Sequence, residues 1–105
     1  VGYKMSKHHA NDAGKGNARS KKPVTKSRIT IPDKLIGLQL RKFRKACDLS
    51  QTDMGRMIGV SYQQVQKIET GENRIAASKL LLLSVKSGKT MEYFCKTARA
   101  YLENN

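Results

Sequence analysis

The segment GVSYQQVQKIETG, residues 59–71, carries side chains whose types and spacing suit contacts to nucleic-acid bases. A glutamine amide presents a donor and an acceptor together and can pair with adenine, a lysine ammonium can donate to guanine, and a tyrosine ring can lie against a thymine methyl group. In a helix that advances by about 100° per residue, Val65 and Ile68 define a buried side, and most polar residues gather opposite them. The sequence therefore predicts base contacts from Tyr62, Gln63, Gln66 and Lys67.

The same polar face has a simpler interpretation as a solvated helix surface. Glutamine and lysine are ordinary surface residues, so composition alone fits either interpretation. The place of the segment in the chain favours base contacts, because it would be the second of two short helices and would expose its N-terminal half. Gln64 falls at about 260° from Val65, to one side of the face, and is expected to take no part.

Two short helices joined by a glycine-led turn position this face. Residues 51–58 and 62–70 carry apolar residues at helical spacing, with Met54 and Ile58 on the inner side of the first helix. A serine precedes each helix and can cap it, and a glycine follows each and can end it in the left-handed conformation. The caps are Ser50 and Ser61, and the glycines that end the helices are Gly59 and Gly71. Together they predict a helix-turn-helix.

Three further helices are expected around this pair, which gives an all-α fold of five helices. Pro32 followed by Asp33 as an N-capping residue predicts a helix over about residues 34–47. A fourth helix is expected over 78–86 and a fifth from about Thr90. The expected inner positions are Ile36, Leu40, Phe43 and Cys47 in the first helix and Met91, Phe94, Cys95, Ala98 and Leu102 in the last.

Positive charge dominates the chain and is concentrated near its N-terminus. The formal net charge is +13 over 105 residues, and residues 1–30 contain eight Lys and Arg against Asp12 alone. That segment has almost no bulky apolar residues, so a flexible basic arm is expected over 1–30 and a folded domain over 31–105. A strongly basic chain of this size favours a polyanionic partner such as nucleic acid.

Several other classes of protein fit the sequence poorly. The longest run of purely apolar residues is far shorter than a membrane-spanning helix, and no secretory signal is recognisable, so a cytoplasmic, nucleoid-associated protein without membrane contact is expected. Cys47 and Cys95 form no CxxC pair and are expected to be small hydrophobic residues in helices, and His8 and His9 lack a third ligand at metal-binding spacing. We expect no metal, no cofactor and no catalysis, because no nucleophile with a nearby base can be assembled.

The run LSQTDMGRMIGVSYQQVQKIETGENRI, residues 49–75, resembles the phage-repressor (Cro- and XRE-like) helix-turn-helix. The family has a glutamine that opens the first helix, a small residue, a glycine and two apolar residues at fixed spacing, completed here by Glu69 and Gly71. The resemblance extends over about residues 33–95 and implies a lambda-repressor-like fold. The sequence is similar to that of alphaproteobacterial transcription regulators. The positions that carry it are Gln51, Gly55, Gly59, Val65 and Ile68.

The resemblance also implies a set of phosphate contacts around the helix-turn-helix. It further implies that Arg44 pairs with Glu69 and with nearby backbone, and we expect this pair to be exposed, to add little stability and to serve orientation. The residues implied to grip phosphates are Gln51, Thr52, Ser61, Thr70, Asn73, Arg74 and Arg44.

Two departures from the family pattern carry expectations of their own. Gly55 stands where the family usually has alanine, at a helix cost of about 1 kcal/mol, so the second helix is expected to be less rigid. Leu81 and Leu82 are added in the fourth helix, and Ser87 and Lys89 stand where similar proteins usually have apolar residues. This change indicates either a locally shifted core or a surface for a dimer or partner.

Together these features predict a bacterial transcription regulator that binds double-stranded DNA as a homodimer. Two alternatives from other classes stay open. One is an antitoxin-type autorepressor, and the other is a transcription adaptor that binds a partner protein through Leu81, Leu82 and the C-terminal helix.

Overall fold

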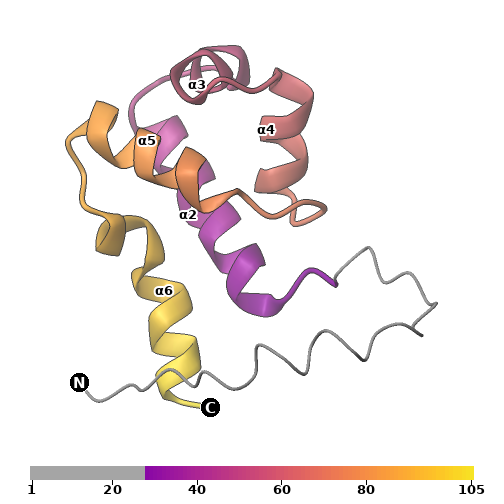
Figure 1. Cartoon of the computed structure of the whole chain (residues 1–105), viewed down its shortest axis with the longest axis vertical. Helices are drawn as coiled ribbons and strands as arrows, with labels where there is room; N and C mark the ends of the chain where they lie inside the picture. Colours follow the sequence, from indigo (N-terminus) through magenta and orange to yellow (C-terminus); the bar gives the residue numbers. More distant parts are fainter. Residues whose placement is uncertain (1–27) are drawn as a thin grey trace, which may run out of the picture.

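A computed structural model describes residues 28–105, which form five helices and no strand (Figure 1). The predicted all-α class is confirmed. Most of the predicted basic arm, with the His8-His9 pair, lies outside the described residues. The helices are α2 (Ile31–Ala46), α3 (Gln51–Ile58), α4 (Tyr62–Glu69), α5 (Ala77–Ser87) and α6 (Met91–Glu103).

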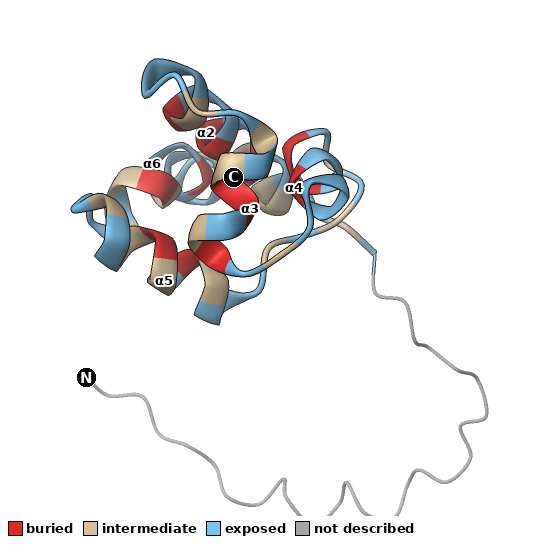
Figure 2. Cartoon of the chain, turned by 90° about the horizontal axis from the view of Figure 1, so that it is seen from above, coloured by how far each residue is buried: buried red, intermediate tan, exposed pale blue. Residues whose placement is uncertain are grey.

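Helix α2 lies at the centre, between α6 on one side and α4 on the other, and α3 packs against both α4 and α5. Figure 2 shows buried segments interleaved with exposed ones in the labelled helices. Phe43, Tyr93 and Phe94 meet edge to face, with ring centroids 5.0 Å apart for the closest pair, Tyr93 and Phe94. The core contains every inner residue predicted for the helix pair and consists of Leu40, Phe43, Met54, Ile58, Val65, Ile68, Leu80, Leu83, Phe94 and Ala98. The inner position predicted for Leu102 is wrong, because this residue in the last turn of α6 is 61% exposed.

Helix α2 begins earlier than the sequence predicted, and its cap is a different residue. Thr30, not Asp33, is the N-cap, and Asp33 lies in the first turn, where its carboxylate accepts from the Thr30 backbone N–H at 2.9 Å. The Thr30 hydroxyl accepts in return from the Asp33 backbone N–H, which completes a capping box. Pro32 fits this first turn because a backbone N–H there would have no helical partner.

Helices α3 and α4 follow the prediction closely. Ser50 caps α3 in a second capping box with Asp53, and Ser61 caps α4 by accepting from the Gln64 backbone N–H at 3.1 Å. Gly59 ends α3 with φ 75°, in the left-handed region that glycine adopts without strain. Helix α4 ends one residue earlier than predicted, with Thr70 as its C-cap.

Helix α5 differs slightly from its predicted range. It starts at Ala77 instead of Ser78, its N-cap Ala76 offers no side-chain hydrogen bond, and it runs one residue further, to Ser87.

The two cysteines occupy different environments, and one prediction about them is wrong. Cys47 is exposed, because α2 ends at Ala46 and the chain turns away through Asp48, whose φ is 60°. Cys95 is half-buried and packs against the core, and this burial, with the nearby Glu92, raises the pKa of its thiol.

Two helical glycines mark places where backbones approach too closely for a side chain. A Cβ atom at Gly55 would lie 2.5 Å from the Val60 carbonyl oxygen, in the turn that leads to α4. A Cβ atom at Gly37 of α2 would overlap the Ile68 carbonyl oxygen of α4. Gly55 therefore serves close packing of the helix-turn-helix, whatever it costs in helix propensity.

We expect stability to fall in acid through the two capping carboxylates. Partial burial raises the pKa of Asp33, but hydrogen bonds from Thr30 and the Arg74 charge outweigh it and hold that pKa below its ordinary value. Hydrogen bonds from the Ser50 backbone and hydroxyl lower the pKa of Asp53. A lowered folded pKa gives stabilisation that is present above the unfolded pKa, about 3.9, and is lost as pH falls through the folded pKa.

The urea midpoint should therefore be steady from pH 7 to about pH 5 and should fall below about pH 4. A variant with Asp33→Asn and Asp53→Asn should lose less stability across that acid range than the parent protein. Equal losses in the two proteins would show that the capping carboxylates are not responsible.

Candidate nucleic-acid interface

The side chains of α4 predicted to contact bases lie on its exposed side. Val65 and Ile68 are 1% and 4% exposed and face the core. The four candidates for base contact are exposed, and Tyr62 keeps 50% of its surface in solvent. Gln64 is exposed as well, so exposure alone does not separate it from the other polar residues. The candidates for base contact are Tyr62, Gln63, Gln66 and Lys67.

A charged network under this face ties α4 to α2 and α3. The Glu69 carboxylate accepts from Arg44 Nε at 2.7 Å and from Arg44 Nη2 at 2.9 Å, which makes a bidentate pair. The same carboxylate accepts from Gln51 Nε2 at 3.2 Å, and Arg44 Nη1 donates to the Leu49 carbonyl at 2.9 Å. One carboxylate at the end of α4 thus holds side chains from the other two helices.

The pairing of Arg44 with Glu69 and the nearby backbone is confirmed, but the expected exposure of this pair is wrong. The side chains of Arg44 and Glu69 are 11% and 2% exposed. The hydrogen bonds to Glu69 raise the pKa of Arg44 further. Burial makes the pair costly to break, because the remaining charge would stay out of water without its partner.

The network changes the geometry of two expected phosphate contacts. Arg44 uses three of its nitrogens inside the protein and lies beneath the surface. The Gln51 side chain is engaged by Glu69, but its backbone N–H belongs to the first turn of α3. The first N–H groups of a helix have no partner within the helix and carry a partial positive charge, so the amides of Gln51 and the exposed Thr52 suit an anion.

The remaining expected phosphate contacts lie in the loop after α4 and at the serine before it. The Thr70 hydroxyl is exposed and donates to the Gln66 carbonyl at 3.1 Å. Asn73 is half-buried, and its backbone N–H donates to the Lys67 carbonyl at 3.1 Å. Ser61 is exposed at the opposite end of α4. These residues surround α4 at both of its ends.

Arg74 connects this loop to the start of α2. Its guanidinium pairs with the Asp33 carboxylate at 3.5 Å and donates to the Arg28 carbonyl at 2.9 Å. The side chain still keeps 43% of its surface in solvent. The first described residues therefore lie beside the loop that follows α4.

Lys34 is a candidate that the sequence reasoning missed. Its aliphatic stem lies next to Gly71, with Cγ 3.1 Å from where a Cβ of that residue would be. Its side chain is exposed and has no ion pair among the described residues. Because Lys34 is 37 positions before Gly71 in the chain, only the packing of α2 on α4 brings this cation to the interface.

Other kinds of site are not evident in the described part of the chain. No group of three His, Cys, Asp or Glu residues could hold a metal ion there. No helix between residues 28 and 105 is long and apolar enough to cross a membrane.

Five helices with an exposed polar second helix in the turn motif define a helix-turn-helix domain. The helix-turn-helix family model matches residues 40–94, and the chain belongs to this family, a DNA-binding class without enzymatic activity. The resemblance to Cro- and XRE-like regulators is thereby confirmed.

Relatives with the same kind of domain occur in alphaproteobacteria. The chain is 42% identical over 62 residues to an uncharacterized transcriptional regulator in the ATPase CF(0) region of Rhodospirillum rubrum, covering 59% of this chain and 57% of that protein. It is 40% identical over 60 residues to an uncharacterized HTH-type transcriptional regulator of Sinorhizobium fredii, covering 57% of this chain and 42% of the relative. A Rickettsia conorii HTH-type regulator is 34% identical over 62 residues, covering 59% and 50%. The chain thus spans about half the length of the curated relatives it matches, and no solved structure matches it.

Proposed function

We propose that this chain is a transcription regulator that binds double-stranded DNA in a sequence-specific manner and reads the major groove with α4. The observation that carries the proposal is the exposed amide and ammonium face of α4, held in place by the buried contacts of Glu69. A helix of this width fits the major groove, where amides and ammonium groups can distinguish base pairs. A regulator of this kind works at the nucleoid, in agreement with the cytoplasmic location expected from the sequence.

Phosphate contacts would position α4 without reading sequence. The amides of Gln51 and Thr52 at the start of α3 suit one phosphate, and Arg74 and Lys34 suit another beside the end of α4. Ser61, Thr70 and Asn73 stay proposed contacts around α4. Arg44 acts in this proposal as a positioning residue, because its donors are used within the protein. The basic arm over residues 1–30 would add salt-dependent attraction to any DNA.

Base reading and phosphate gripping should separate in alanine variants. Replacing Gln63 or Lys67 by Ala should cost about 1–3 kcal/mol of binding at one or two positions of the preferred site and barely change affinity for unrelated DNA. Lys34→Ala should weaken binding to all sequences alike and reduce the slope of log K against log salt by about 1.

Gln64→Ala is the matched control, since Gln64 is also an exposed amide on the same helix but falls to one side of the face. Binding of all four variants should be measured on the preferred site and on its single-base variants at one salt concentration. A change in base preference in Gln64→Ala but not in Gln63→Ala would mean that α4 docks in another orientation.

We also propose that the chain binds DNA as a two-fold dimer. Four candidate side chains on α4 can read only about three or four base pairs, so one copy would discriminate weakly among genomic sites. Two copies should place their α4 helices about 34 Å apart and protect an inverted repeat with half-site centres roughly 10 bp apart. Sedimentation of the free protein and of its DNA complex checks this, and a one-to-one complex on the preferred site would contradict it.

A further inference from the structure

Helix α5 has an apolar face on its outer side as well as on its inner side. Leu80 and Leu83 are 5% and 0% exposed and belong to the core. Leu81 and Val85 point outward, with 53% and 71% of their surfaces in solvent, and Leu82 is half-buried between the two faces. Leu82 packs against the core as well, whereas Leu81 and Val85 do not belong to the core of the described residues.

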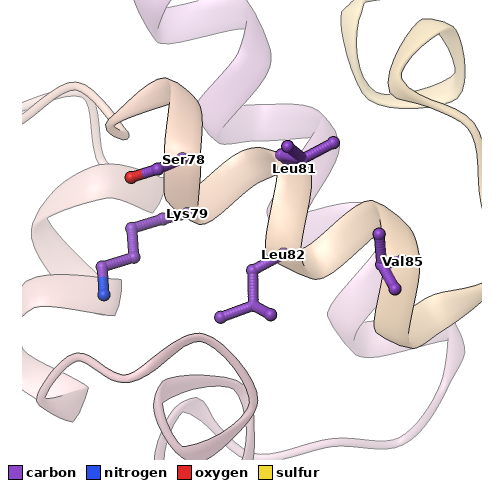
Figure 3. A pocket seen from close by; sticks show the side chains of 5 residues that line it. All are labelled: Ser78, Lys79, Leu81, Leu82 and Val85. Atoms are coloured by element: carbon purple, nitrogen blue, oxygen red, sulfur yellow. The ribbon is translucent and has the colours of Figure 1, made fainter.

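The outer face lines a groove suited to another helix. The groove has a volume of about 380 Å³ and is lined by Ser78, Lys79, Leu81, Leu82 and Val85 (Figure 3). Ser78, Leu81, Leu82 and Val85 stand at positions i, i+3, i+4 and i+7, which is the spacing by which one helix packs along another. None of these residues is a candidate for DNA contact, but Lys79 Nζ lies near the turn between α3 and α4, 3.3 Å from where a Cβ of Gly59 would be.

Positive charges follow one edge of this groove. Lys79 and Lys86 are seven positions apart, so they lie on the same edge of α5, two turns from each other. Helix α5 contains no Asp or Glu, and neither ammonium group has an ion pair among the described residues. Long lysine stems can cover apolar surface at such an edge while the charges stay in water.

We propose that this face binds an amphipathic helix of another protein that carries leucine-like residues on one side and carboxylates along the edge that meets Lys79 and Lys86. A second copy of the chain fits the charges poorly. An antiparallel two-fold pair of α5 helices would bring the two lysine edges together, and a parallel pair would offer them no carboxylate. A different protein with carboxylates along its edge would avoid the repulsion and supply the missing partners of the lysines. Such a surface would serve the alternative function of a transcription adaptor that binds a partner protein.

Three synthetic helical peptides of equal length provide the probe. The first repeats leucines at i, i+3, i+4 and i+7 and has glutamates along both edges, the second replaces the glutamates by lysines, and the third scrambles the first. Affinity for the full chain is measured by fluorescence anisotropy at about 0.15 M salt, where attraction between distant charges is screened. We expect the first peptide to bind at least tenfold more tightly than either of the others.

Variants of the chain locate the binding. A Leu81→Ser, Val85→Ser protein should bind the first peptide at least tenfold more weakly, and Leu102→Ser, which removes a 61% exposed leucine from α6, should bind it unchanged. Lys79→Glu with Lys86→Glu should reverse the preference between the first and second peptides. The DNA affinity of the Leu81→Ser, Val85→Ser protein should stay that of the parent, which separates this surface from the DNA interface.

Three results would overturn the proposal. Equal binding of the first and scrambled peptides would reduce the effect to general charge attraction. Unchanged peptide binding in the Leu81→Ser, Val85→Ser protein would show that the peptide binds to another surface. Conversion of a dimer to a monomer by the same substitutions, measured by sedimentation, would make a second copy the occupant of the groove.

Discussion

Replacing Gly37 by alanine should destabilise the protein by about 3 kcal/mol, because the added methyl group overlaps the Ile68 carbonyl oxygen. The obstacle is backbone at the end of α4, so no side-chain rotation relieves it, and α2 and α4 must move apart. Alanine would gain only about 1 kcal/mol from its higher helix propensity. The overlap should therefore outweigh the propensity gain, and urea unfolding measures the difference.

Gly88→Ala is the control for this substitution. Gly88 has φ 78° and open space around it, so alanine there costs only the left-handed conformation, about 1–2 kcal/mol. We expect Gly37→Ala to be the more damaging change and also to weaken DNA binding, since the displaced end of α4 carries Glu69. A Gly37→Ala protein as stable as the parent would show that α2 and α4 are not packed as closely as described.

Breaking the buried ion pair should have an effect of similar size. Arg44→Met leaves the Glu69 carboxylate 2% exposed with only the Gln51 amide beside it, and we expect a loss of about 3 kcal/mol. Glu69→Gln should cost a comparable amount, because it leaves the arginine charge without its carboxylate. The protein with both substitutions should lose less than the sum of the two, since neither charge then remains unpaired.

Arg99→Met provides the matched control on the surface. Arg99 also pairs with carboxylates, Glu92 at 3.2 Å and Glu103 at 3.1 Å, but is 61% exposed. Its loss should cost far less than the loss of Arg44, because water screens an exposed ion pair. Additive losses for Arg44→Met and Glu69→Gln, measured by urea unfolding, would contradict direct coupling between the two residues.

The helix-turn-helix was predictable because its signals are local. Serine caps and glycine stops act through the backbone of their own turn, so the boundaries of α3 and most of α4 follow from residues a few positions apart. The predicted start of α2 was wrong for an equally local reason. Thr30 and Asp33 form a capping box, and Asp33 fills its third helical position and not the cap.

The features that the sequence did not reveal depend on tertiary packing. Helical periodicity placed Cys47 on an inner face, but it could not show that α2 ends one residue earlier. The burial of Arg44 depends on how α2 and α4 cross, as does the close approach at Gly37. The same packing brings Lys34 to the interface, and no residue near it in the sequence predicts this position.

Base reading by α4 is tested most directly by selecting binding sites from random double-stranded DNA with the parent protein and with the Gln63→Ala variant. We expect the parent to enrich an inverted-repeat motif and the variant to enrich the same motif with preference lost at one or two positions of each half-site. Recovery of no motif by the parent, or of identical motifs by the two proteins, would contradict base reading through this face of α4.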